Sequence, residues 1–250
     1  MNKFQGSFGI MQGRLSPPKD NLIQHYPTET WEDEFAHCTE LGLECIEWIF
    51  EYPNIDQNAL FNDKEVEKIN YLSKKYDIKI NSVVADYFMV NKLFNENQKN
   101  LQQNIDVFNN LINQCKKANI PIIELPFVDS SSMKSNQHKT EVIENLLPLI
   151  DNASKLNIKI SLETDLDPKS FKTFIKNFGI ENVYINYDMG NSASLGYNPV
   201  EEISEYGDKI INVHIKDREL GGTTVPLGSG NTDFETVFKS LEAINYSHDF

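Results

Sequence analysis

Short apolar runs alternate with helical patterns along almost the whole of this 250-residue chain. The runs are rich in Ile, Val, Phe and Tyr, which favour β-strands, and they occupy residues 8–13, 44–50, 78–86, 120–127, 158–165, 183–191 and 211–217. Several are apolar at nearly every position, as is typical of parallel strands that are covered on both faces. Strict strand–helix alternation over about 250 residues favours a (β/α)₈ TIM barrel. We therefore expect a single α/β barrel domain over residues 1–250.

The segments between the runs carry the signals with which helices begin. Asn62 precedes an apolar stripe and has Glu65 three residues after it, which is the pattern of a capping box. Asp167 and Asn198 each precede a proline, so a capping side chain stands before a residue suited to the first helical position. No G-x-G-x-x-G motif follows the first predicted strand, which disfavours a dinucleotide-binding sheet.

An eighth strand is missing from this series. The last predicted helix, at about residues 234–244, is followed by the sequence NYSHDF at residues 245–250. These residues are typical of a segment that leads into a β-strand. We expect either that the chain is cut short or that the barrel closes in another way, because an open edge between the first and seventh strands would favour aggregation.

The overall charge and the cysteines limit the class of protein. The chain has 23 Lys and Arg against 37 Asp and Glu, a net charge of −14, which disfavours nucleic-acid partners but allows a small anionic ligand in a locally basic pocket. The three cysteines are an odd number and form no CxxC motif, as expected in a reducing compartment. No apolar run approaches the roughly 18 residues of a membrane span, and no signal peptide is recognisable. We expect a cytoplasmic protein without membrane contact.

Polar residues recur at the carboxyl ends of the predicted strands, which share one mouth in a parallel barrel. Glu163, Asp188 and His214 come from three successive runs, so we expect them to be neighbours. Two carboxylates and one imidazole suit a divalent metal ion, Mn²⁺, Mg²⁺, Co²⁺ or Zn²⁺, with positions left open for substrate oxygens. A lone histidine would more often be a hydrogen-bonded core residue. Three such residues at matching depth favour a metal site instead.

Other strand ends offer candidates for contact with a substrate. Four of these residues could contact substrate or could pair with a neighbouring side chain: Gln12, Glu47, Asp86 and Glu124. Asn191 is a further candidate for substrate contact. Arg14 and Arg218 are candidates for binding an anionic group, whereas Lys216 is expected to point away from the mouth because side chains alternate along a strand. The backbone amides of Gly228 and Gly230 could hold a phosphate, or their segment could be an ordinary capped loop.

Several motifs together resemble the xylose-isomerase-like TIM barrels, in the group of sugar phosphate isomerases and epimerases. They are ETD (163–165), YDMGN (187–191), VHIKD (213–217), PLGSGNTDF (226–234) and NYSHDF (245–250). The resemblance covers most of the chain and is most specific from residue 158 onward, where it is greatest to the L-ribulose-5-phosphate 3-epimerases. It implies that Glu163, Asp188 and His214 bind one metal ion, with a fourth ligand, a glutamate of the eighth strand, beyond Phe250. Where the family often has a second histidine, this sequence has Asn191.

The resemblance also implies a reaction. A ketose would chelate the metal ion, a cis-enediolate would be stabilised, and Glu163 would remove the proton next to the carbonyl as the catalytic base. The eighth-strand glutamate is the family's second acid–base group, so its loss would damage epimerisation more than aldose–ketose isomerisation. We expect a metal-dependent isomerase or epimerase of a small sugar or sugar phosphate, with a homodimer expected by analogy. The alternatives are a dehydratase or lyase on the same scaffold and a non-catalytic barrel.

Overall fold

The computed structural model describes residues 4–18, 24–53 and 55–250. Its main sheet is parallel, with neighbouring strands in sequence order from β1 to β7. The strands are β1 Gly9–Met11, β2 Cys45–Ile49, β3 Lys79–Val84, β4 Ile122–Phe127, β5 Lys159–Thr164, β6 Val183–Asp188 and β7 Ile210–His214. Each lies within or beside a run predicted from the sequence, and the α/β barrel class is confirmed.

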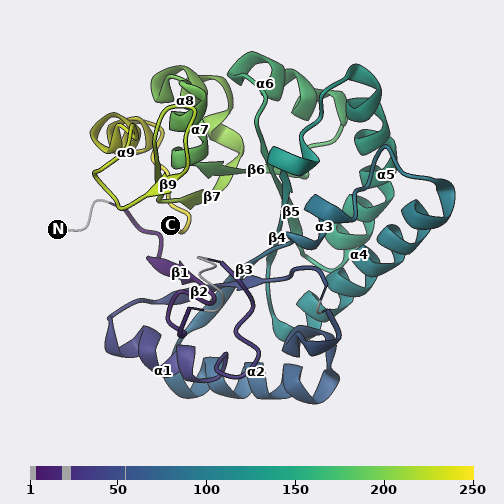
Figure 1. The fold of residues 1–250 in the computed structure, drawn as a ribbon, viewed down its shortest axis with the longest axis vertical. Helices are drawn as coiled ribbons and strands as arrows, with labels where there is room; N and C mark the ends of the chain where they lie inside the picture. Colours follow the sequence, from purple (N-terminus) through teal and green to yellow (C-terminus); the bar gives the residue numbers. More distant parts are fainter. Residues whose placement is uncertain (1–3, 19–23, 54) are drawn as a thin grey trace.

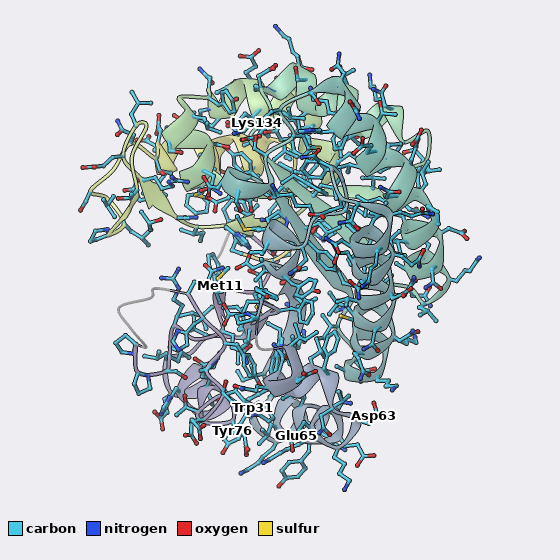
Figure 2. The ribbon with its side chains drawn as sticks, turned by 45° about the vertical axis from the view of Figure 1, so that its right-hand side comes forward. Met11, Trp31, Asp63, Glu65, Tyr76 and Lys134 are labelled. Atoms are coloured by element: carbon cyan, nitrogen blue, oxygen red, sulfur yellow. The ribbon has the colours of Figure 1, made fainter. Side chains whose placement is uncertain are left out.

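Helices connect the strands and surround them as an outer layer, with α1, α2, α4, α5, α6 and α8 visible around the central sheet in Figure 1. The helices are α1 Asp33–Glu40, α2 Asp63–Tyr76, α3 Tyr87–Val90, α4 Gln98–Ala118, α5 Asn136–Lys155, α6 Pro168–Asn177, α7 Met189–Leu195, α8 Pro199–Tyr206 and α9 Phe234–Ala243. Figure 2 places Met11 of β1 nearer the middle of the molecule than Glu65 and Tyr76 of α2. Among the described residues, no helix has the length and apolar character that crossing a membrane requires.

The predicted helix starts are confirmed by side-chain hydrogen bonds. The Asn62 side chain accepts from the backbone N–H groups of Lys64 and Glu65. Asp167 caps α6 and Asn198 caps α8 in the same way, each just before a proline. These bonds satisfy donors that the first turn of a helix leaves without a partner. These three helices therefore begin where the local sequence predicts.

The strands carry an apolar set of side chains and a polar set. All six residues of β4 are buried, as expected for a strand covered on both faces. The interior also contains buried polar side chains, where small barrels are usually filled by branched apolar ones. The buried polar residues on the strands include Ser82, Glu124, Ser161, Asn186 and Asn212. Such groups are costly to bury unless they bond to each other or to a ligand.

The segment predicted to lead into an eighth strand lies between β7 and β1. Asp249 forms a parallel bridge with Asn212 of β7. On the other side, the Phe250 N–H donates to Ser7 O, and Phe250 O accepts from the Gly9 N–H, both at 2.9 Å. Figure 1 shows the same arrangement, with the C-terminus between β1 and β7. The NYSHDF segment thus occupies the eighth-strand position and joins the two edges of the sheet.

Candidate metal centre and substrate pocket

Glu163, Asp188 and His214 meet at the carboxyl ends of β5, β6 and β7. Each offers one ligand atom, and these atoms all lie within 4.8 Å of one another. The His214 Nδ1 atom is 3.9 Å from both Glu163 Oε2 and Asp188 Oδ2. The sheet register explains the meeting, because Asp188 is paired directly with His214 across β6 and β7. The structure therefore brings together the three residues that the sequence proposed as neighbours.

Glu47 of β2 orients the imidazole from the opposite side. Its Oε2 atom lies 2.8 Å from His214 Nε2, while its Oε1 accepts from Ser82 Oγ at 2.7 Å and from Asn212 Nδ2 at 3.1 Å. Burial alone would lower the pKa of His214, but the Glu47 carboxylate raises this pKa well above its ordinary value. Glu47 was predicted either to contact substrate or to pair with a neighbouring side chain. It pairs with His214 and also lines the cavity described below.

Glu163 is held at both carboxylate oxygens by asparagine side chains. Asn186 Nδ2 donates to Oε2 at 2.9 Å, and Asn191 Nδ2 donates to Oε1. Burial, together with the negative charge of Asp188, raises the pKa of Glu163 to about 7. Asn186 is a site residue that the sequence analysis missed. Its signal was available, because it lies two positions before Asp188 and therefore faces the same side of β6.

Lys216 points into the site, so the prediction that it faces away is wrong. Its Nζ atom is 3.1 Å from Asp188 Oδ2 and 3.1 Å from Asn191 Oδ1. Alternation was misapplied, because a residue two positions after His214 lies on the same face of an extended chain as His214 itself. Burial would raise the pKa of Asp188, yet the charges of Lys216 and His214 hold it at about 2. Asp188 is therefore an anion across the physiological pH range.

A cavity of about 680 Å³ opens over these groups, within the usual size range of small-molecule sites. Arg14, Asp86 and Glu124 line it, as their predicted role requires. Gln24 Nε2 donates to Asp86 Oδ2 at 2.6 Å, and burial raises the pKa of Asp86 to about 6. Within residues 4–18, 24–53 and 55–250, no hydrogen bond or ion pair reaches the Arg14 guanidinium, which is available to a ligand.

Gln12 and Arg218 serve the scaffold, in contrast to their predicted contact with substrate. Gln12 is 1% exposed, and its Oε1 accepts from the Ile49 N–H at 3.1 Å, which ties the end of β1 to β2. The Arg218 guanidinium donates to Asn191 Oδ1 at 2.8 Å and to Gly222 O at 2.7 Å. Neither residue lines the cavity. Protein groups engage both side chains because each lies at a junction between segments.

The predicted phosphate loop is held by a carboxylate of the protein. Asp217 Oδ2 accepts from the backbone N–H groups of Gly228 at 2.9 Å and Gly230 at 2.8 Å, and its Oδ1 accepts from Thr232 N at 3.0 Å. Asp217 belongs to the short strand β8 (Asp217–Arg218), which pairs with β9 (Thr224–Val225). The two glycine amides are therefore occupied, and the phosphate role proposed for them is not supported by this geometry.

The donor set fits a divalent cation. Glu47, Glu124, Glu163 and Asp188 are buried or nearly so, and they line the same cavity as His214. His214 pairs with Glu47 and Lys216 pairs with Asp188. Several carboxylates in a small volume are unfavourable unless a cation or protons neutralise them. Because the pKa of His214 is raised, a bound ion would displace a proton from its imidazole. Two carboxylates and the imidazole then suit Mn²⁺, Mg²⁺, Co²⁺ or Zn²⁺ and do not select among them. The residues that would hold the ion are Glu163, Asp188 and His214.

Comparison with known proteins gives relatives along most of the chain. The family described as xylose isomerase-like TIM barrels matches residues 35–248. A probable L-ribulose-5-phosphate 3-epimerase of Mycoplasma pneumoniae is 24% identical, over 84% of this chain and 72% of that protein. An inosose dehydratase of Clostridium botulinum is 35% identical, but over 26% of this chain and 28% of that protein.

A solved structure gives the same architecture. The IolI protein, crystallised with a bound zinc atom, has a TM-score of 0.75 at 18% identity, with 97% of this chain and 87% of that chain covered. At this level of identity the likeness establishes the fold, and the chemistry of the site has to be argued from its own residues.

Proposed function

Because this chain belongs to the xylose isomerase-like TIM barrel family, we propose that it is a metal-dependent isomerase or epimerase of a sugar or sugar phosphate. The observation that carries the proposal is the meeting of Glu163, Asp188 and His214 beneath a cavity of about 680 Å³. The relative of M. pneumoniae, a probable epimerase of L-ribulose 5-phosphate, supports the substrate class. A fold of this kind hosts many reactions, so the site and not the barrel defines the chemistry.

Glu163, Asp188 and His214 are the residues that would bind the ion. A divalent ion in this position supplies Lewis acidity toward a carbonyl oxygen. Glu47 keeps the His214 ring in one orientation through the 2.8 Å contact with Nε2, so that Nδ1 faces Asp188 and Glu163. Residues behind a metal ligand commonly tune its orientation and basicity in this way.

Glu163 is the group best suited to move a proton. A carboxylate in this position can accept a proton from the carbon next to a carbonyl and return it. The two asparagine contacts hold both its oxygens, so the carboxylate is positioned before the substrate arrives. A single base on one face suffices for aldose–ketose isomerisation. Epimerisation also needs a proton donor on the other face.

A dehydratase is the second candidate, favoured by the partial similarity to inosose dehydratase. Removal of a proton next to a carbonyl can be followed by loss of a hydroxyl group two carbons from it, and Glu163 would serve both reactions in the first step. The products distinguish them, because elimination yields a dehydrated sugar whereas isomerisation preserves the formula.

The decisive experiment follows the proton. The purified chain is stripped of metal, reloaded separately with Mn²⁺, Mg²⁺, Co²⁺ or Zn²⁺, and incubated in D₂O with L-ribulose 5-phosphate or with L-ribulose. We expect deuterium to enter the carbon next to the carbonyl with at least one ion, and Glu163→Gln to slow this exchange by roughly 10²–10⁴-fold. Deuterium exchange in the metal-free chain, or a lack of exchange in every sample, would contradict the proposal. A dehydrated product would favour the second candidate.

A further inference from the structure

Glu124 is a buried carboxyl group whose oxygens have no partner among the residues that the structure describes. It lies in the middle of β4 and is 0% exposed. Across the part of the chain that the structure describes, neither Oε1 nor Oε2 makes a hydrogen bond. Its register partner on β5 is Ser161, whose Oγ is also without a partner, so the two side chains do not satisfy each other.

Leaving such a group without a partner is costly to the folded state. A buried donor or acceptor without a hydrogen bond leaves its desolvation penalty uncompensated, and an apolar residue of the same size would avoid that penalty. Unsatisfied buried polar atoms are few in native proteins and call for an explanation, such as a ligand. Glu124 lines the cavity above the candidate metal centre, so this carboxyl group lies in the wall of the space that a ligand would occupy.

The surroundings of Glu124 indicate which ligand group it can take. Glu47 and Glu163 line the same cavity and surround it with negative charge, which excludes a phosphate or carboxylate of the substrate from this spot. Burial and the charge of Glu163 raise the pKa of Glu124 well above its ordinary value. A protonated carboxyl group has one O–H donor and further acceptor capacity. A hydroxyl group also has one O–H donor and acceptor lone pairs, so it can both donate to and accept from such a carboxyl group.

A second metal ion does not fit this position. Among the described residues, the group that brings three ligand atoms within 4.8 Å of one another is Glu163, Asp188 and His214, and it does not include Glu124. Glu124 also lies deeper in the barrel, because the register pairs Glu163 with Pro126, two residues further along β4.

We propose that Glu124 binds a hydroxyl group of the substrate at the floor of the cavity. This assignment rests on the proposed function, since it takes the ligand to be a polyhydroxylated sugar. It adds a contact residue on β4, away from the three residues that would hold the metal. Its free carboxyl group is then explained as a site prepared for substrate at the expense of stability.

The test compares Glu124→Met with Glu124→Gln in the purified, metal-loaded chain. Methionine has a similar length and no hydrogen-bonding group of comparable strength, whereas glutamine keeps a donor and an acceptor. Titration calorimetry measures the Kd for L-ribulose 5-phosphate, and thermal unfolding without sugar measures Tm. We expect Glu124→Met to raise Tm and to weaken sugar binding roughly 10–100-fold. Glu124→Gln should bind sugar within about threefold of the unaltered chain.

Deoxy analogues of the same sugar identify the hydroxyl group. One analogue should lose affinity for the unaltered chain and bind Glu124→Met equally well, because the contact is already absent. If Glu124→Met does not fold, the deoxy analogues are compared on the unaltered chain and on Glu124→Gln. We expect the same analogue to lose affinity for both of these chains.

The outcomes separate the two proposals. Equal sugar affinity in the unaltered chain and Glu124→Met, or a lower Tm in both variants with unchanged affinity, would overturn the role of Glu124 and leave the proposed function intact. Absence of sugar binding and of deuterium exchange in the unaltered chain would overturn the proposed function, and the assignment of Glu124 with it.

Discussion

His214 Nε2 lies 2.8 Å from Glu47 Oε2, across the barrel mouth from the two carboxylates that Nδ1 faces. The imidazole therefore bridges β2 and the β5–β6 side of the barrel. Ser82 and Asn212 in turn hold Glu47. A histidine near the end of a strand is in this way given one orientation before any ligand binds.

Metal binding should depend on both members of this pair. His214→Ala removes a predicted ligand, and we expect bound divalent metal, measured by elemental mass spectrometry, to fall from near one ion per chain to background. Glu47→Gln leaves the ligands in place but weakens their orientation, so metal affinity measured against a chelator should fall about 10–100-fold. His37→Ala, at an exposed position on α1, is the control and should keep its metal. Equal metal content in all three variants would contradict the site.

Stability should depend on pH through Asp86. Burial raises the pKa of Asp86 from an ordinary 3.8 to about 6, so its contribution to stability is present below pH 4 and is lost as the pH rises through 6. Asp86→Asn should therefore stabilise the chain at pH 7.5 by about 1–2 kcal/mol, a figure reduced because the side chain is partly exposed. The gain should shrink at pH 4.5.

Urea unfolding of Asp86→Asn at both pH values checks this sign. Asp56→Asn, at an exposed position, should change the midpoint little at either pH. A gain for Asp86→Asn that is larger at pH 4.5 than at pH 7.5 would contradict the prediction.

Arg14 should distinguish phosphorylated from free sugars. Arg14 lines the cavity, and a guanidinium binds phosphate oxygens through paired donors. We expect Arg14→Gln to weaken binding of L-ribulose 5-phosphate about 10–100-fold and to leave binding of L-ribulose nearly unchanged. Calorimetric titration with both sugars measures this. An equal loss for the two sugars would show that Arg14 does not recognise the phosphate.

The turn that carries Arg14 should be sensitive at Gly13. Gly13 has φ +87°, and an added Cβ would meet the backbone oxygen of His25 at 2.2 Å; Glu34 also accepts the Gly13 N–H at 2.9 Å. Gly42 has φ +71° with nothing within 4 Å of an added Cβ. Gly42→Ala should cost about 1 kcal/mol from backbone conformation alone.

Gly13→Ala should cost clearly more than Gly42→Ala, because the clash with His25 adds to the same backbone penalty. Urea unfolding of the two variants measures the difference. Similar losses would mean that the turn at residues 13–15 relaxes without resistance, and that it does not hold Arg14 in place.

The barrel and the three central site residues could be predicted because both follow from local patterns. Apolar runs with capped helices between them place each strand, and the carboxyl ends of parallel strands share one mouth. Glu163, Asp188 and His214 were identified by that rule alone. Asn186 was missed although it lies two positions before Asp188 and faces the same side of β6. Its hydrogen bond to Glu163 is seen only when the partner strand is in place.

By itself, the sequence determined the strands, the caps and the chemical groups available at the mouth. Only the tertiary structure decided how those groups pair. Lys216 contacts Asp188, Asp217 accepts from the amides of Gly228 and Gly230, and the Glu124 oxygens have no hydrogen-bond partner among the described residues. Strand placement depends on neighbours within a few residues of one another. A hydrogen bond within the barrel depends instead on distances between segments far apart in the sequence, which the closed packing of the strands sets.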